Sequence, residues 1–303
     1  MRTIVLGPPG TGKTTTLLTK VDDYLKQTDP DKIGYFAFTQ KAAHEARDRA
    51  MKQFNLEEDD LPYFRTLHSL AFRKLGLKKD QVMQPRHYKD LGKKLGFPVT
   101  YADYQEDQGG IFTSDSEYLR IIQLAQLRNI TPEQQFDLQE HTQDLERDQL
   151  RIIHNELARY KKEYNLIDFN DMILDFVKSD LSPKFDVVFI DEAQDLSLMQ
   201  WDMTKSIWNK TKDSFIAGDD DQAIFRWAGA DVDSFIALEG QYLPLTQSYR
   251  IPAKVHSLAM GIINKIRNRI DKTWEPRVSQ GNLYRHFDIE SIDMSTGDWL
   301  VLS

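Results

Sequence analysis

The sequence predicts an α/β fold with a parallel sheet, because short apolar segments alternate with helical patterns. Four segments are candidate strands: residues 3–6, 33–38, 186–190 and 214–217. Each is rich in β-branched or aromatic residues without polar alternation, which is typical of strands buried on both faces. Helical patterns at 14–26, 41–53 and 198–208 accompany them. This alternation favours a doubly wound unit whose helices cover the sheet.

Residues 73–164 differ from the flanking chain, because they are rich in Glu, Gln, Arg, Lys and Leu and have few β-branched runs. Helical stretches are expected at 117–128 and 133–162. The spacing of Leu145, Ile152, Ile153, Leu157 and Tyr160 fits an amphipathic helix. We therefore expect a mostly helical insertion, with residues 113–116 forming a loop and a helix N-cap.

A further unit is expected from residue 246 onward. A helical pattern spans residues 252–270, and an apolar run at 299–302 is a candidate core strand. That strand would belong to an unfinished unit with an unpaired edge and exposed apolar surface.

Composition excludes several classes of protein. The 39 basic and 47 acidic residues give a net charge of −8, which excludes a histone-like polybasic protein but leaves room for a narrow basic groove. The absence of cysteine excludes disulfides, thiolate zinc sites and cysteine nucleophiles. No apolar run approaches the roughly 18–20 residues of a membrane helix, and the N-terminus has no signal-peptide pattern. We expect a cytoplasmic protein without a membrane partner.

A phosphate-binding loop is predicted at residues 7–14, GPPGTGKT, between the first strand and the first helix. Pro8 and Pro9 lack an N–H, so the amides that surround phosphate come from Gly10 onward. Lys13 would reach the β- and γ-phosphates, and the Thr14 hydroxyl would bind Mg²⁺. The rest of the expected nucleotide site is Gly7, Gly10, Thr11, Gly12 and Thr15. The alternative is an accidental match.

Two further polar segments follow predicted strands, where ligands bind in parallel sheets. Asp191 would hold Mg²⁺, and Glu192 would polarise an attacking water as general base. The alternative for this pair is a solvated acidic turn. Gln222 could donate to a γ-phosphate or orient water. Phe225 and Trp227 are suited to stacking on bases, although such aromatic residues also occur in cores.

Seven segments occur in the order of motifs I, Ia, Ib, Id, II, III and IV of UvrD/Rep-type superfamily 1 DNA helicases. They are residues 7–15, 38–43, 66–69, 166–171, 191–195, 218–231 and 247–250. The chain resembles this family over about residues 1–255. The resemblance implies a RecA-like P-loop NTPase domain, 1A, at 1–72 and 165–245. It also implies a helical insertion, 1B, at 73–164, and the incomplete start of domain 2A, a second α/β lobe, at 246–303.

The resemblance also implies roles for individual residues. Single-stranded DNA would contact Phe38, Thr39, Gln40, Thr66 and His68, with Phe225 and Trp227 stacking on its bases. Tyr249 would stack on adenine, and Arg250 would reach the γ-phosphate from the second lobe. The residues after Gln222 favour the 3′→5′ branch by analogy.

Some residues keep a structural alternative. His68 alone could be a hydrogen-bonded core histidine, and Asp168 and Asp171 could cap the following helix.

The sequence departs from the family in two places. The glutamine that reads adenine upstream of the phosphate loop is missing, which leaves the preference between ATP and GTP open. Motifs V and VI are also missing. We therefore expect an ATP-dependent helicase or translocase portion that binds Mg²⁺-ATP and single-stranded DNA but hydrolyses and unwinds poorly alone. A longer chain or a second polypeptide would complete the motor.

Two other functions stay open at this point. One is a nucleotide-gated DNA-binding accessory subunit without efficient catalysis. The other is a phosphate-loop ATPase or kinase that acts on something other than nucleic acid, a class that the acidic net charge favours.

Overall fold

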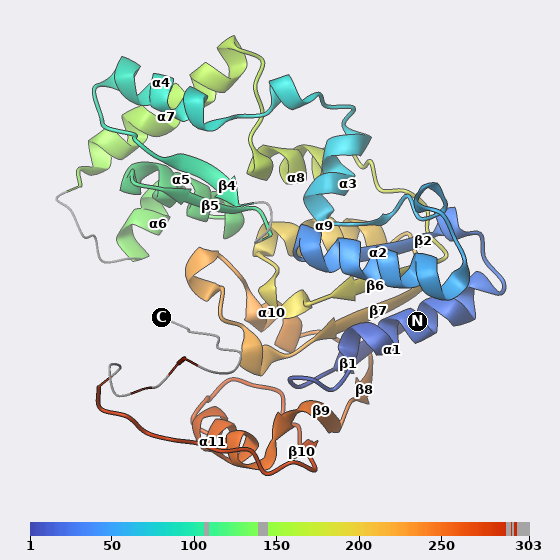
Figure 1. The fold of residues 1–303 in the computed structure, drawn as a ribbon. Helices are drawn as coiled ribbons and strands as arrows, with labels where there is room; N and C mark the ends of the chain where they lie inside the picture. Colours follow the sequence, from blue (N-terminus) through green and yellow to red (C-terminus); the bar gives the residue numbers. More distant parts are fainter. Residues whose placement is uncertain (106–108, 139–144, 289–291, 293, 296–303) are drawn as a thin grey trace.

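The centre of the molecule is a six-stranded parallel sheet with the strand order β3-β2-β6-β7-β1-β8 (Figure 1). This computed structural model describes residues 1–105, 109–138, 145–288, 292, 294 and 295. The strands are β1 (Arg2–Leu6), β2 (Ile33–Ala37), β3 (Phe64–Arg65), β6 (Val187–Asp191), β7 (Asp213–Gly218) and β8 (Gln241–Pro244). The predicted α/β fold with a parallel sheet is confirmed.

The four predicted strands are present with ends shifted by one residue. Two strands of the central sheet were missed. β3 has only two residues, and β8 is a largely exposed edge strand that contains proline. Neither forms the continuous buried apolar run from which the others were recognised.

Helices cover both faces of the sheet, as Figure 1 shows. One face packs against α1 (Lys13–Leu25) and α2 (Gln40–Phe54). The other packs against α3 (Leu67–Lys74), α8 (Phe169–Lys178), α9 (Leu198–Trp208) and α10 (Val232–Ile236). Successive strand residues point to opposite faces: in β1, Val5 joins the first core, whereas Ile4 and Leu6 join the second.

The insertion has a hydrophobic core of its own. Its elements are α4 (Pro85–Leu95), β4 (Ala102–Gln105), β5 (Ile111–Ser114), α5 (Glu117–Leu127), α6 (Pro132–Leu138) and α7 (Arg147–Glu163). Leu150, Ile153, Leu157 and Tyr160 of α7 are buried.

Three expectations for the insertion need correction. β4 and β5 form an antiparallel pair, so Thr113 and Ser114 lie in a strand and not in a loop. Ser116 does cap α5, where its side chain accepts from the Leu119 N–H. Leu145 precedes α7 and Ile152 is half exposed, because the helix turns that position toward solvent.

The first turn of α8 explains Asp168 and Asp171 in structural terms. Asp168 is the N-cap, and the two carboxylates form a reciprocal capping box. Lys161 Nζ lies 2.9 Å from Asp168 Oδ2 and 2.6 Å from Asp171 Oδ2. Of the two alternatives, the structure shows the capping role.

The C-terminal part contains β9 (Gln247–Pro252), α11 (Ala253–Ile263) and β10 (Glu275–Arg277), with β9 and β10 paired. The helix expected over 252–270 ends at Ile263, and Arg269, Ile270 and Lys272 bond instead to carboxylates at the end of β7. The strand expected at 299–302 lies outside the described residues. Short 3₁₀ helices are η1 (Pro30–Lys32), η2 (Glu58–Asp60), η3 (Lys79–Gln81), η5 (Ala193–Asp195), η6 (Asp220–Gln222) and η7 (Arg226–Ala228). Over the described ranges, no helix is both long and apolar enough to cross a bilayer.

Candidate nucleotide and nucleic-acid site

The predicted phosphate loop connects β1 to α1 at the carboxyl edge of the sheet. The Lys13 ammonium donates to the Gly7 carbonyl at 3.0 Å, and the Thr11 hydroxyl donates to Pro8 O at 2.7 Å. A Cβ at Gly7 would lie 2.0 Å from Lys13 Cγ, and Gly10 combines a φ of +72° with close packing on Arg250. Both glycines are required by this geometry. The loop thus holds Lys13 folded back over its own backbone.

Asp191 ends β6 beside this loop. Its Oδ2 accepts from Thr14 Oγ1 at 2.7 Å and from the buried Tyr35 hydroxyl at 2.9 Å. Burial, followed by the charge of Glu192, raises the pKa of Asp191. The Thr14 and Asp191 oxygens are hard donors of the kind Mg²⁺ takes. The described part of the chain contains no group of three or more His, Asp or Glu side chains placed to hold a metal ion.

Glu192 occupies an unusual backbone conformation, with φ 54° and ψ 45°. A residue with a Cβ rarely adopts this left-handed region, and such strain clusters at functional sites. Its carboxylate lies 3.5 Å from Lys13 Nζ and accepts from Gln194 Nε2 at 3.0 Å. The carboxylate is therefore held beside the phosphate loop by a cation and an amide.

A cavity of about 720 Å³ brings the predicted nucleotide residues together. Its lining includes Gly10, Thr11, Gly12, Lys13, Thr14, Thr15, Asp191, Glu192, Gln222, Tyr249 and Arg250. Gly7 takes part through the bond from Lys13. The Gln222 amide is held by Asp219 Oδ2 at 2.5 Å. Tyr249 is 75% exposed at the rim, leaving its ring free for a planar ligand.

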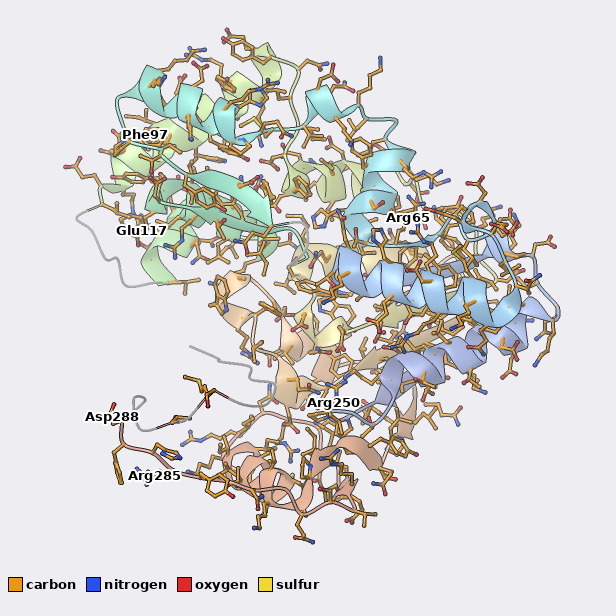
Figure 2. All side chains as sticks on the ribbon, in the orientation of Figure 1. Arg65, Phe97, Glu117, Arg250, Arg285 and Asp288 are labelled. Carbon is orange, nitrogen blue, oxygen red and sulfur yellow. The ribbon has the colours of Figure 1, made fainter. Side chains whose placement is uncertain are left out.

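The C-terminal segment reaches this cavity through β9. The Ser248 hydroxyl donates to Pro9 O at 2.7 Å, and the Tyr249 N–H donates to Gly10 O at 2.9 Å. Figure 2 shows Arg250 between the sheet and the C-terminal segment. Arg49 and Arg277 also line the cavity. Sequence reasoning missed Tyr35, Arg49 and Arg277, because none stands in a pattern that distinguishes it from ordinary strand or helix positions. Ser248 lies in the recognised segment 247–250 but was given no role there.

The residues expected to contact DNA are not among those that line the nucleotide cavity. Gln40, Thr66 and His68 line a second cavity of about 800 Å³. Thr39 and Thr66 are the N-caps of α2 and α3, where each side chain accepts a backbone N–H. Both threonines therefore have a structural task in addition to any contact with a ligand.

His68 is buried, and its Nε2 has no hydrogen-bond partner among the described residues. Burial lowers the pKa of His68 to about 4, so the ring is neutral at pH 7. The imidazole is therefore not the fully hydrogen-bonded core histidine of the structural alternative.

The three aromatic residues predicted to contact DNA, of which Phe225 and Trp227 were expected to stack on bases, differ in exposure. Phe38 is buried and its ring centroid lies 5.6 Å from that of Phe225, which is partly buried. Trp227 in η7 is 63% exposed. Only Trp227 therefore presents its ring to solvent, whereas Phe38 is covered by Phe225 and by Gly109.

Comparison with known proteins agrees with this geometry. Residues 1–243 match the UvrD/REP helicase N-terminal domain family. The chain belongs to this family.

Three relatives show how far the similarity extends. The chain is 23% identical to the ATP-dependent DNA helicase Rep of Buchnera aphidicola, over 93% of this chain and 46% of that protein. It is 24% identical to PcrA of Staphylococcus epidermidis, over 94% and 41%, and 24% identical to PcrA of Staphylococcus aureus strain Mu50, over 89% and 39%. Both PcrA proteins are also described as ATP-dependent DNA helicases. The chain spans less than half the length of these relatives.

Proposed function

We propose that this chain is the N-terminal portion of an ATP-dependent DNA helicase or translocase that moves 3′→5′. The supporting observation is the hydroxyl–carboxylate contact of 2.7 Å between Thr14 and Asp191, with Glu192 held 3.5 Å from Lys13. This arrangement supports Mg²⁺-ATP as the ligand of the 720 Å³ cavity. The helicase names of the relatives support DNA as the partner, and the cytoplasm as the location.

The proposed hydrolysis divides its tasks among the residues of the cavity. Loop amides and Lys13 bind the phosphates. Thr14 and Asp191 would hold Mg²⁺, which when bound would withdraw negative charge from the phosphate oxygens. Glu192 accepts a proton from water at its carboxylate, while the Gln222 amide orients that water. Arg250 neutralises the γ-phosphate from the opposite side, and Tyr249 stacks on the base.

We further propose that single-stranded DNA follows the cavity lined by Gln40, Thr66 and His68 toward Trp227. The neutral imidazole with an unpaired Nε2 supports a contact with a base or sugar. Stacking on Trp227 would add affinity without sequence preference. Phe38, Thr39 and Phe225 complete this path, and the buried Phe38 requires a rearrangement before a base can reach it.

We propose three domains. Residues 1–72 and 165–245 form the RecA-like domain 1A, residues 73–164 form the insertion 1B, and residues 246–303 form the start of domain 2A. The last of these exposes an apolar stripe on and just after α11, where Leu258, Ile262 and Ile266 are each more than 40% exposed. A stripe of this kind supports the proposal that further polypeptide covers it. Either a longer chain or a second polypeptide would supply that cover, and hydrolysis by the 303-residue chain alone would be slow.

The same uncovered stripe favours one second candidate. A nucleotide-gated DNA-binding accessory subunit would bind both ligands with no useful turnover.

ATPase assays with and without a single-stranded oligonucleotide separate the proposals. Turnover that DNA stimulates, and that Lys13→Ala abolishes, supports the helicase. Lys26→Ala, an exposed lysine at the other end of α1, serves as the control and should match the wild type. DNA binding without turnover would support the accessory subunit. Turnover indifferent to DNA would contradict both.

A further inference from the structure

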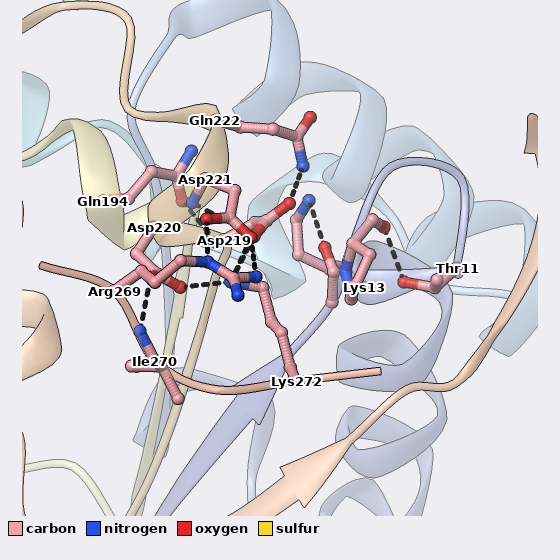
Figure 3. A network of polar contacts seen from close by, with 12 residues as sticks. Thr11, Lys13, Gln194, Asp219, Asp220, Asp221, Gln222, Arg269, Ile270 and Lys272 are labelled. Carbon is pink, nitrogen blue, oxygen red and sulfur yellow. Dashed lines mark hydrogen bonds and ion pairs between the residues drawn. The ribbon is translucent and has the colours of Figure 1, made fainter. Parts of the chain in front are cut away.

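Three consecutive aspartates, Asp219, Asp220 and Asp221, are buried at the end of β7, with side chains 1%, 0% and 3% exposed. We call them the aspartate loop (Figure 3). Buried carboxylates are costly unless cations and hydrogen bonds compensate them. The loop therefore depends on its partners.

Those partners come from the segment between α11 and β10, about fifty residues later in the chain. Lys272 Nζ lies 3.1, 2.6 and 2.8 Å from the three carboxylates in turn, and is itself 2% exposed. Two Arg269 nitrogens donate to Asp221 at 2.8 and 2.7 Å, and the Ile270 N–H donates to Asp220 at 2.7 Å. Three carboxylates thus face two cations, leaving one negative charge.

The cations remain charged in this site. Burial favours the neutral form of Lys272, but the attraction of Asp219 and its hydrogen bonds to Asp220 and Asp221 raise its pKa above the ordinary value. Likewise, burial would raise the pKa of Asp221, but the bonds from Arg269 and Lys272 hold it below its ordinary value.

The aspartate loop is also bonded to the nucleotide site. Asp219 Oδ2 accepts from Gln222 Nε2 at 2.5 Å, and the Asp219 N–H donates to Gln194 Oε1 at 3.1 Å. The amide of Gln194 in turn donates to Glu192 at 3.0 Å. Gln194 is 2% exposed, so its orientation is set by these bonds. A displacement of Asp219 would therefore move both Gln222 and Glu192.

We propose that Lys272 and Arg269 are positioning residues that clamp the aspartate loop and so hold Gln222 and Glu192 in place for hydrolysis. They tie the segment after α11 to the γ-phosphate side of the cavity. An apolar anchor could bury the same area, but it could not fix three carboxylates. This inference rests on the proposed ATP hydrolysis, although the clamp is testable without it.

The test compares Lys272→Met with Lys272→Arg in the full 303-residue chain. Lys265→Met, an exposed lysine of the same segment, is the matched control. We expect Lys272→Met to lower kcat by about 10- to 100-fold, the usual effect of misplacing catalytic groups by about an ångström. The Kd for a non-hydrolysable ATP analogue should stay unchanged. Lys272→Arg should keep most of the turnover, because it preserves the positive charge. If Lys272 only filled space, the conservation of charge would bring no such advantage over Lys272→Met.

Amide hydrogen exchange of residues 219–227 provides a readout independent of catalysis. Exchange should accelerate in Lys272→Met and not in Lys265→Met. Wild-type kcat and wild-type exchange in Lys272→Met would overturn the clamp. A wild type that binds DNA without turnover would instead favour the accessory subunit over the helicase, and exchange would still decide the clamp.

A charge-balanced double variant covers the case in which Lys272→Met fails to fold. Lys272→Met with Asp220→Asn removes one positive and one negative charge, so the net charge of the cluster stays at −1 while Arg269 keeps its bonds to Asp221. We expect this pair to restore the thermal midpoint and part of the exchange protection. A double variant that is no more protected than the folded single variant, or that also fails to fold, would contradict the charge argument.

Discussion

Asp195 carries the sharpest prediction about pH. It lies at the end of η5, 8% exposed, and its Oδ1 has no hydrogen-bond partner among the described residues. Burial, together with the charge of Glu192, raises its pKa from 3.8 to about 7. The folded protein therefore binds the Asp195 proton more tightly than the unfolded chain does. The free energy of unfolding must fall as pH rises between about 4 and 7 on account of this group.

The magnitude follows from the size of the shift. A change of about 3 units is worth about 4 kcal/mol in total, at about 1.4 kcal/mol per unit. Between pH 5 and pH 8 the pH passes through about 2 of these units, from 5 to the folded pKa near 7. The free energy of unfolding should therefore fall by roughly 3 kcal/mol on account of Asp195. His68 acts in the opposite direction, because its pKa is lowered from 6.5 to about 4 and stability is gained as pH rises through that window. The wild-type profile alone therefore does not isolate Asp195.

The decisive measurement is urea unfolding of the wild type and Asp195→Asn at pH 5 and pH 8. Asparagine cannot ionise, so the stability of the variant relative to the wild type should rise by up to about 3 kcal/mol from pH 5 to pH 8. Asp186→Asn, at an exposed aspartate just before β6, is the control and should show a constant difference. A constant or falling difference for Asp195→Asn would refute the reasoning.

Three further predictions concern Glu192, Trp227 and Tyr35. Glu192→Gln should retain ATP-analogue binding and lose turnover, measured by calorimetry and phosphate release; undiminished turnover would remove Glu192 as the base. Trp227→Ala should weaken oligonucleotide binding by about 1–3 kcal/mol in a fluorescence titration, and wild-type affinity would contradict base stacking there. Tyr35→Phe removes one hydrogen bond to the buried Asp191 and should cost about 1.5–3 kcal/mol of unfolding free energy. Unchanged urea midpoints would show that this hydroxyl contributes little.

The parallel sheet and much of the nucleotide cavity could be predicted because their signals are local. Each central strand is a continuous apolar run, and the polar residues that follow such a run lie at the carboxyl edge of the sheet. Lys13, Asp191 and Gln222 follow three different strands. The carboxyl ends of parallel strands lie at the same edge of the sheet, so these three residues were expected to lie close together. In the structure they line one cavity.

Local patterns failed where the partner of a residue lies far along the chain. The apolar pattern after Pro252 continues to residue 270, but the helix ends at Ile263, and Arg269 and Ile270 bond to the distant aspartate loop. The hairpin β4-β5 and the edge strand β8 likewise depend on a neighbouring strand and not on their own sequence.

Sequence alone therefore determined the chemistry available at the sheet edge: a phosphate loop, an acidic pair and a neutral amide. Only the tertiary structure decided how these groups are held. Three adjacent aspartates look like a solvated turn until Lys272 is placed against them, and Asp195 looks ordinary until its burial is known. The energy of a charge depends on its solvation and its neighbours, and neither is encoded by spacing along the chain.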